Sequence, residues 1–497
     1  MSEAYDDLAK RFHRLGALRA ASGMLQWDSA AMMPAGAAAG RAEQIAQLNL
    51  VCHEILTDPL IADLLDRAEA ASPDTNPWNR ANLREMRRAW RHATAVPPAL
   101  VEALSRAVSD CEHYWREARH RNDFAGLKPK FERVLSLVRE SAAAKAQAFG
   151  MSPYDALLDE YEPGLSALRI DALFGDLLPF LKDAFPRVID RQAKEPPPLR
   201  PEGPFPVEAQ RRLGLDFMAV LGFDFERGRL DVSHHPFTGG APSDVRITTR
   251  YHEGDFLRGL MGVWHETGHA LYEQGLPEAW ALQPVGQAPG MVLHESQSLL
   301  IEMQVCRSDA FLGFAAPRIA EAFGGRGKAW EPGNLARHSR RVARSLIRVD
   351  ADEVSYPLHV ILRYRLERAM IAGELTIADL PGAWNEAMRE LVGIAPPDDK
   401  DGCLQDIHWP GGAFGYFPTY TLGALAAAQL FAAASRAEAS IAAGIAKGDF
   451  KPLLAWLRAN IHGRGHLERT DALLAAATGA PLGTDAFKAH IARRYLS

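Results

Sequence analysis

Two histidines stand four residues apart in the segment GVWHETGHALYEQG, residues 262–275, and a glutamate follows the first of them. On a helix, His265 and His269 would lie on one face, one turn apart, so both imidazoles could reach one metal ion at about 2.0–2.1 Å. Glu266 could reach a water molecule on that metal and serve as a general base. The pattern predicts a hydrolytic metal site; the alternative is a helix that carries two core histidines.

A hydrolytic zinc site usually has three protein ligands and one open position. The segment GMVLHESQSLLIEMQ, residues 290–304, offers Glu295 and His294 after a connection whose Gly and Pro content could turn the chain back. Glu295 is favoured because His294 would point roughly 100° away on the same helix. The spacing alone leaves this choice open. A zinc ion in such a set lowers the pKa of its water towards about 7.

The elements that must position these residues are mostly helical. Residues 6–21 place Leu8, Phe12, Leu15 and Leu18 on one stripe, and similar patterns recur through roughly the first 190 residues. The Pro-rich stretch 194–206 cannot continue a helix and predicts a long connection. From residue 255 onward the helical pattern returns, interrupted at Gly and Pro clusters.

One region favours β-structure. Residues 228–237 (GRLDVSHHPF) and 244–251 (DVRITTRY) alternate and are rich in β-branched residues. TGGAPSD, residues 238–244, is typical of a turn or short loop between them. We therefore expect a hairpin, and hence a small sheet inside an otherwise helical protein.

Composition excludes several classes of function. The 497 residues carry a net charge of -6, so no basic excess predicts binding to nucleic acid or to anionic lipid. A chain of this length can bury a large core without a metal to hold it together. Its four dispersed cysteines are typical of reduced thiols in a cytoplasmic protein. Neither a signal peptide nor a membrane span is predicted.

Motifs along essentially the whole chain resemble the M32 family of metallocarboxypeptidases, the group of thermostable carboxypeptidase Taq. In order they are HPF (235–237), DVRITTRY (244–251), HETGH (265–269), HESQS (294–298), IRVDAD (347–352), GCLQDIHW (402–409) and GYFPTYTLG (415–423). Near the start, WDSAAMMP has Ser and Ala where an acidic residue and Thr would be more usual for the family. This departure lies outside the predicted metal site.

The resemblance implies a mainly α, zincin-like fold, helical and two-lobed with a deep groove and a small β-sheet, similar to neurolysin and angiotensin-converting enzyme. It implies a single peptidase unit over residues 1–497, in which the helical pattern and the Pro-rich connection indicate approximate sub-lobes at 1–193 and 207–497. It also implies a homodimer that releases single residues from peptide C-termini with broad specificity. One zinc ion per chain, replaceable by cobalt, would be held by His265, His269 and Glu295, with Glu266 as the base.

Such an enzyme must recognise a free carboxylate, and arginine does this well because its planar guanidinium donates two charge-assisted hydrogen bonds. Arg348 in IRVDAD is the first candidate, and Arg250 and Arg246 are weaker ones. Asp350 and Asp352 could orient Arg348 or a ligand histidine. The alternative for each arginine is a surface or ion-pair role.

By similarity to the same groove peptidases, His408 and Tyr420 would donate to the oxyanion of the tetrahedral intermediate, with Tyr416 as the alternate tyrosine. The alternative for Tyr420 is a core aromatic. Gln405 is a candidate for binding the substrate backbone. His235 opens the HPF motif, which we expect to close one end of the groove so that a single residue fits beyond the scissile bond.

Two other functions stay open. An oligoendopeptidase could share the helix motif and would cut peptides internally. A helical binding protein could carry a vestigial metal site, although the intact ligand set argues against it.

Overall fold

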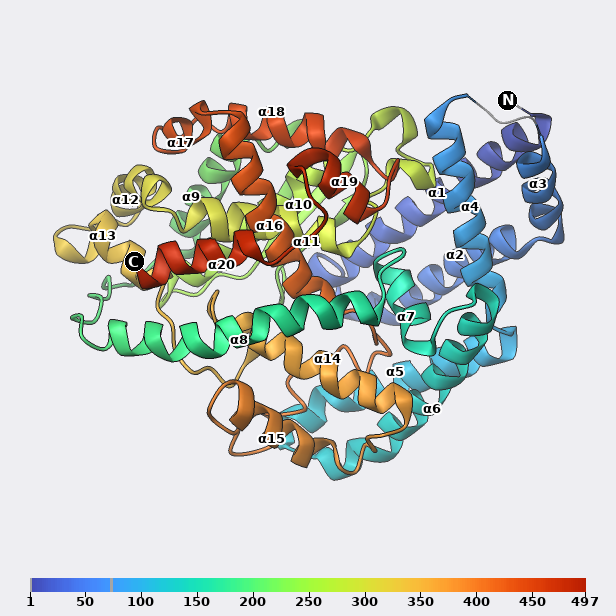
Figure 1. Cartoon of the computed structure of the whole chain (residues 1–497), viewed down its shortest axis with the longest axis horizontal. Coiled ribbons are helices and arrows are strands. Elements are labelled where there is room, and N and C mark those ends of the chain that lie inside the picture. Colours follow the sequence, from blue (N-terminus) through green and yellow to red (C-terminus); the bar gives the residue numbers. More distant parts are fainter. Residues whose placement is uncertain (1, 72–74) are drawn as a thin grey trace. The chain divides into compact units, whose positions relative to one another are not determined.

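Helices dominate the computed structural model, which describes residues 2–71 and 75–497 (Figure 1). The residues group into two compact units, each assembled from three stretches of the chain. The first unit holds residues 1–93, 198–340 and 426–482, and the second holds 94–197, 341–425 and 483–497. The predicted mainly α fold with a small sheet is confirmed. The sub-lobes at 1–193 and 207–497 stay a prediction.

The described part of the first unit consists of N-terminal helices, a small sheet and the helices around it. Its helices are α1 (Glu3–Ala31), α2 (Ala38–Thr57), α3 (Pro59–Ala70), α4 (Pro77–Ala95), α9 (Val207–Leu221), α10 (Phe256–Glu273), α11 (Met291–Leu299), the π-helix η5 (Leu300–Cys306), α12 (Asp309–Phe323), α13 (Pro332–Ser339), most of α16 (Pro418–Ala437), α17 (Ser440–Ile445), α18 (Lys451–Asn460) and α19 (Thr470–Thr478).

The described part of the second unit is helical. Its elements are α5 (Pro98–Arg121), α6 (Phe124–Phe149), α7 (Pro153–Tyr161), α8 (Ala167–Gln192), the 3₁₀ turn η7 (Arg348–Asp350), α14 (Tyr356–Ala372), α15 (Leu380–Leu391), α20 (Asp485–Ile491) and the π-helix η9 (Ala492–Leu496). The predicted long connection is found between α8 and α9, and the chain passes from the second unit to the first within it.

The sheet exists, but its topology differs from the predicted hairpin. Strands β1 (Gly228–Val232), β2 (Phe237–Ala241) and β3 (Asp244–Thr249) lie in the order β1-β3-β2, with β1 parallel to β3 and β2 antiparallel to it. The hairpin therefore joins β2 to β3, and most of the predicted loop is a strand. Gly240 permits this, because its φ is 105° and a Cβ would lie 2.2 Å from the Asp244 carbonyl oxygen. Glycine in a sequence is typical of turns, so strand β2 was not predicted.

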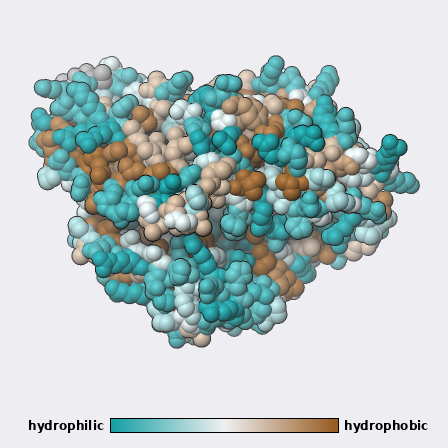
Figure 2. Space-filling view, turned by 180° about the vertical axis from the view of Figure 1, so that it is seen from behind, coloured by the Kyte–Doolittle hydropathy of each residue, from teal (hydrophilic) through white to brown (hydrophobic). Residues whose placement is uncertain are grey.

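Hydrophilic side chains predominate on the face shown in Figure 2, and the hydrophobic ones gather in several separate groups. Most large apolar side chains are buried inside the units, with exceptions such as Leu168. Among the helices that the structure describes, none is long and apolar enough to cross a membrane.

Candidate active site

Helix α10 carries the paired histidines and is fixed in the first unit by its cap and its apolar face. Asp255 caps its start, where Oδ1 accepts hydrogen bonds from the backbone N–H groups of Leu257 and Arg258. Trp264 is fully buried and packs edge-on against Phe217 and Phe311. This packing fixes the rotation of α10 about its axis, and with it the direction of the neighbouring histidines.

A glycine within the HETGH motif lets the returning helix approach α10 closely. A Cβ on Gly268 would lie 2.4 Å from the carbonyl oxygen of Gln297 and 2.6 Å from Cα of Ser298. Any larger residue would push α11 away. The close approach brings Glu295, on α11, to the two histidines of α10.

His265, His269 and Glu295 form the one group of three or more His, Cys, Asp or Glu side chains within residues 2–71 and 75–497 that could hold a metal ion. One ligand atom from each lies within 4.8 Å of the others. Oε2 of Glu295 is 3.3 Å from Nε2 of His269 and 4.0 Å from Nε2 of His265. Two imidazole nitrogens and a carboxylate oxygen are a donor set that suits zinc and leaves a coordination position open.

In both His265 and His269, Nδ1 lies within hydrogen-bond distance of an oxygen atom of the protein. Nδ1 of His265 lies 2.9 Å from Oε2 of Glu302, and Nδ1 of His269 lies 3.0 Å from the carbonyl oxygen of His294. Both partners are acceptors, so each Nδ1 carries a hydrogen, and in the neutral ring that a metal requires the lone pair is on Nε2. Such an arrangement would suit histidines that bind a metal.

His294, the competing candidate for the third position, points elsewhere. Its Nε2 lies 2.8 Å from Oε1 of Glu273, outside the group of three. Its ring lies beside that of His269, with 4.6 Å between the centroids. The side chain that joins the two histidines is therefore that of Glu295.

Acidic groups dominate the electrostatics of this site. Burial alone would lower the pKa of His265, but Glu302, Glu295 and Glu266 outweigh it and raise the pKa to about 10. For Glu295, burial alone would raise the pKa, but His269 and His265 hold this pKa below its usual value. A site that favours positive charge this strongly is suited to a cation.

Glu266 is buried beside the group and is held by a strand of the sheet. Oγ1 of Thr238, on β2, lies 2.7 Å from Oε2 of Glu266 and 3.0 Å from its carbonyl oxygen. The sequence assigned this threonine to a loop, so the contact was not predicted.

The other predicted residues of the first unit make different contacts. Arg250 is exposed, and its Nη1 donates to the carbonyl oxygen of His234 at 3.4 Å. Arg246 pairs with Asp244 at 2.6 Å and covers the ring of Trp27. His235 is exposed and precedes β2. None of the three belongs to the described metal group.

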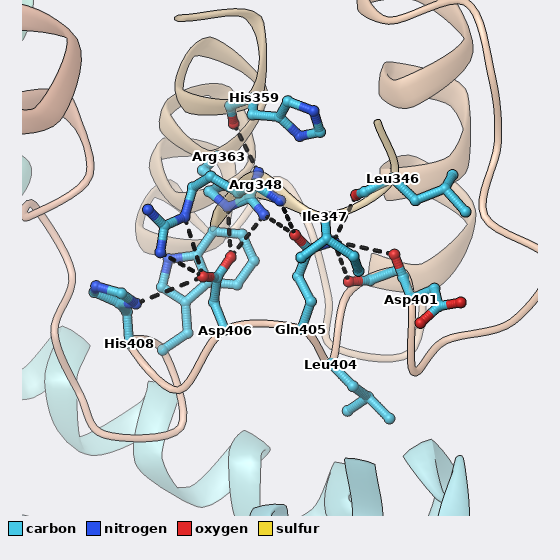
Figure 3. A network of polar contacts seen from close by, with 12 residues as sticks. Leu346, Ile347, Arg348, His359, Arg363, Asp401, Leu404, Gln405, Asp406 and His408 are labelled. Carbon is cyan, nitrogen blue, oxygen red and sulfur yellow. Dashed lines mark hydrogen bonds and ion pairs between the residues drawn. The ribbon is translucent and has the colours of Figure 1, made fainter. Parts of the chain in front are cut away.

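Arg348, in the second unit, belongs to a buried cluster that Figure 3 shows around one carboxylate. Its Nε and Nη2 donate to Oδ1 of Asp406 at 3.1 and 2.8 Å, and its Nη1 donates to the hydroxyl of Tyr356. Nε of Arg363 donates to Oδ2 of the same carboxylate at 2.7 Å. Burial would raise the pKa of Asp406, but the two arginines hold it far below its usual range.

Gln405 braces this cluster. Its Oε1 accepts from the backbone N–H of Arg348 at 2.8 Å and from Nη2 of Arg363 at 2.7 Å, while its Nε2 faces the carbonyl oxygens of the chain around it (Figure 3). Asp352, a predicted partner of Arg348, accepts instead from the backbone N–H groups of Ala343 and Ser355.

His408 and two tyrosines form an aromatic group at the edge of the cluster. Nε2 of His408 lies 3.1 Å from the hydroxyl of Tyr420, and its Nδ1 lies 3.9 Å from Asp406. The ring of Tyr416 lies 5.6 Å from that of His408. Burial lowers the pKa of His408 to about 4, so its imidazole is neutral at pH 7.

Several residues around the two clusters were not identified from the sequence. Glu302 follows Glu295 at a spacing of seven residues, which shares a helix face, so periodicity could have indicated it. Asp406 lies within the recognised segment GCLQDIHW, but nothing there distinguishes it as an ion-pair centre. Arg363 lies on α14, and no spacing rule relates it to Asp406.

Comparison with known proteins gives concordant matches. The sequence model of the carboxypeptidase Taq (M32) metallopeptidase family matches residues 7–495. Thermostable carboxypeptidase 1 of Thermus thermophilus is 42% identical over 99% of this chain and 98% of its own length. Among solved structures, Trypanosoma cruzi metallocarboxypeptidase 1 superposes with a TM-score of 0.97 at 42% identity over 100% of both chains. The M32 carboxypeptidase of Deinococcus radiodurans R1 has a TM-score of 0.93 at 35% identity over 99% of both chains.

Proposed function

Since the chain belongs to the carboxypeptidase Taq (M32) family and is a metallocarboxypeptidase, we propose that it uses zinc to release single C-terminal amino acids from peptides with broad specificity. The observation that carries this proposal is the convergence of Nε2 of His265, Nε2 of His269 and a carboxylate oxygen of Glu295 beside Glu266. These ligand types and their held tautomers are what a hydrolytic zinc site needs.

The proposed ligands are His265, His269 and Glu295, with one zinc per chain and cobalt as a substitute. When bound, the ion would supply a Lewis acid that acidifies a water molecule and polarises the scissile carbonyl. With only one carboxylate among the three proposed ligands, a divalent ion held there would keep a net positive charge and hence its Lewis acidity.

Glu266 is the proposed general base. Its Oε2 accepts a hydrogen bond from Thr238, which leaves Oε1 to take the proton from the attacking water. The same oxygen would deliver that proton to the nitrogen of the leaving amino acid. A carboxylate held at one oxygen can receive and return a proton at the other without reorienting.

Arg348 is the proposed recognition residue for the C-terminal carboxylate of the peptide. It shares Asp406 with Arg363, so two buried guanidinium groups face one carboxylate and a positive charge is left over. A buried excess of positive charge favours an anion. Arg250, Gln405, Tyr416 and His235 remain secondary candidates for contacts with substrate.

His408 and Tyr420 are the proposed donors to the oxyanion. The hydroxyl of Tyr420 and Nε2 of His408 share one hydrogen bond, so the imidazole can orient the phenol or the reverse. Preorganised donors of this kind stabilise the charge that develops in the transition state.

We also propose a cytoplasmic homodimer. The four cysteines are free and buried, as expected for a protein that keeps its thiols reduced. Light scattering tests the dimer, because its mass in solution should be twice the 54.5 kDa of one chain.

Mass spectrometry of a mixed peptide set, with and without a chelator, tests reaction, direction and metal dependence together. The proposal predicts stepwise loss of C-terminal residues that stops with the chelator, returns with zinc or cobalt, and fails on C-terminally amidated peptides. Internal fragments, or cleavage of the amidated peptides, would instead favour an oligoendopeptidase. No cleavage under any of these conditions would favour a binding protein.

A further inference from the structure

One carboxylate lies near each ring nitrogen of His265, and only that of Glu302 is within hydrogen-bond distance. Oε2 of Glu302 lies 2.9 Å from Nδ1, while Nε2 faces Glu295. The first contact determines which nitrogen carries the hydrogen, because a carboxylate only accepts. In the neutral ring that a metal requires, the lone pair is thereby left on Nε2, the nitrogen that faces Glu295.

A change of helix type accompanies this arrangement. Glu295 and Glu302 are seven residues apart, which puts them on one helix face but about 10 Å apart along an α-helix axis. Helix α11 ends at Leu299, and the π-helix η5 continues from Leu300 to Cys306. Glu302 therefore lies in a stretch of wider turns, and such stretches are frequent at functional sites.

Arg307 holds Glu302 in place and neutralises it. Its Nη2 donates to Oε1 of Glu302 at 2.6 Å, and each of the two side chains is only 12% exposed. Its Nη1 donates to the carbonyl oxygen of Ser339, and Nε of Arg340 donates to the carbonyl oxygen of Arg307. One oxygen of Glu302 is thus bonded to Arg307 and the other to His265.

The pairing also limits the charge of the site. Without Arg307, Glu302 would add an unpaired buried carboxylate beside those of Glu295 and Glu266, at a high desolvation cost. With Arg307 the carboxylate is compensated, so Glu302 can orient His265 without competing for the metal.

We propose that Glu302, held by Arg307, is a positioning residue that orients His265 and sets the metal affinity of the site. This inference rests on the proposed function, because it takes His265 as a ligand. Loss of a partner that orients a ligand histidine typically weakens metal binding by about 10–100-fold.

The test measures metal affinity directly. Metal-free wild type and E302Q are titrated with Zn²⁺ in competition with a chromophoric chelator, and the visible spectrum of each Co²⁺ form is recorded. We expect E302Q to raise the Kd for zinc by about 10–100-fold and to alter the Co²⁺ spectrum. R307K should shift both readouts in the same direction by less.

E273Q is a matched control. Glu273 also accepts from a partly buried histidine, but that histidine is His294, which lies outside the metal group. Its Kd should stay within about twofold of wild type, because no proposed ligand loses a partner. A general effect of Glu→Gln changes in this region would instead weaken both variants.

The outcomes separate this inference from the proposed function. An E302Q Kd within about twofold of wild type would overturn the role of Glu302 alone. Wild type that binds no zinc would overturn the proposed function. If metal-free E302Q lacks the circular dichroism of wild type, E302D replaces it: a raised Kd supports the role of Glu302 and an unchanged one rejects it.

Discussion

The two buried clusters differ in the sign of the charge that they leave uncompensated. Around His265, burial opposes protonation, but three glutamates outweigh it and raise the pKa to about 10. At His408, burial lowers the pKa to about 4, and Arg348 and Arg363 act in the same direction although Asp406 opposes them. The same side chain is therefore stabilised as a cation in one cluster and as a neutral ring in the other.

This difference indicates which ligand would complete each cluster. The first has more carboxylates than cationic side chains, since Arg307 pairs with Glu302 while Glu295 and Glu266 remain. The second has two guanidinium groups on one carboxylate. A cation would complete the first and an anion the second, and a metallocarboxypeptidase needs both a metal and a means of recognising a C-terminal carboxylate.

The most severe way to break the first cluster is to remove a proposed ligand. H269A should lose bound zinc and with it all measurable peptide hydrolysis, while the fold remains because a core of this size does not depend on a metal. Metal analysis by mass spectrometry, together with amino-acid release, measures both. H294A is the control: its ring neighbours His269, yet it should keep the metal. Equal metal loss in the two variants would contradict the assignment.

Removing the proposed base should have the next largest effect. E266Q keeps the size of the side chain but cannot take a proton, so kcat should fall by roughly 10²–10⁴-fold while zinc content stays unchanged. E278Q, at an exposed position in the connection after α10, provides the comparison variant. Full activity in E266Q would remove this residue from the mechanism.

Neutralising the shared carboxylate breaks the second cluster. D406N leaves Arg348 and Arg363 buried without their counter-ion, so the free energy of unfolding in urea should fall by about 3–5 kcal/mol. D398N removes a partly exposed pair with Lys400 and should cost less than about 1 kcal/mol. Similar losses of unfolding free energy in D406N and D398N would mean that the buried ion pairs contribute no more to stability than an exposed one.

Substitution of the two tyrosines beside His408 tests which hydroxyl of the second cluster contributes to the reaction. Y420F removes the hydroxyl that contacts His408, and kcat should fall by about 10²–10³-fold with a smaller change in KM. Y416F removes the alternate hydroxyl and should change kcat much less. If Y416F proved the more damaging of the two, the oxyanion role would pass to Tyr416.

Acidification should produce the smallest effect. The pKa of Asp406 in the folded protein lies far below its ordinary value of 3.8, so its ionised form contributes stability that is complete well above that value and is lost as the pH falls below it. The difference in unfolding free energy between wild type and D406N should therefore narrow from about pH 5 to about pH 2. Urea unfolding at several pH values measures it, and a constant difference would contradict the assignment.

Local spacing was sufficient where the candidate residues lie on one helix. His265 and His269 lie four residues apart on a single helix, so periodicity alone predicts their common face, and Glu266 directly follows the first of them. Glu295 required the returning helix, which the Gly and Pro content of the connection indicated without determining the distance. Strand β2 was predicted as a loop because Gly239 and Gly240 are typical of turns. The hydrogen bond from Thr238 to Glu266 was not predicted for the same reason.

The sequence by itself determined the family, the helical class and the paired histidines, because these depend on motifs and on periodicity within single elements. Tertiary structure decided what surrounds them. Gly268 lets α11 approach and bring Glu295 to the histidines, and η5 carries Glu302 and Arg307 behind His265. Asp406 meets Arg348 and Arg363 from distant parts of the chain. Long-range ion pairs leave no periodic trace in a sequence, since they depend on distances that only packing sets.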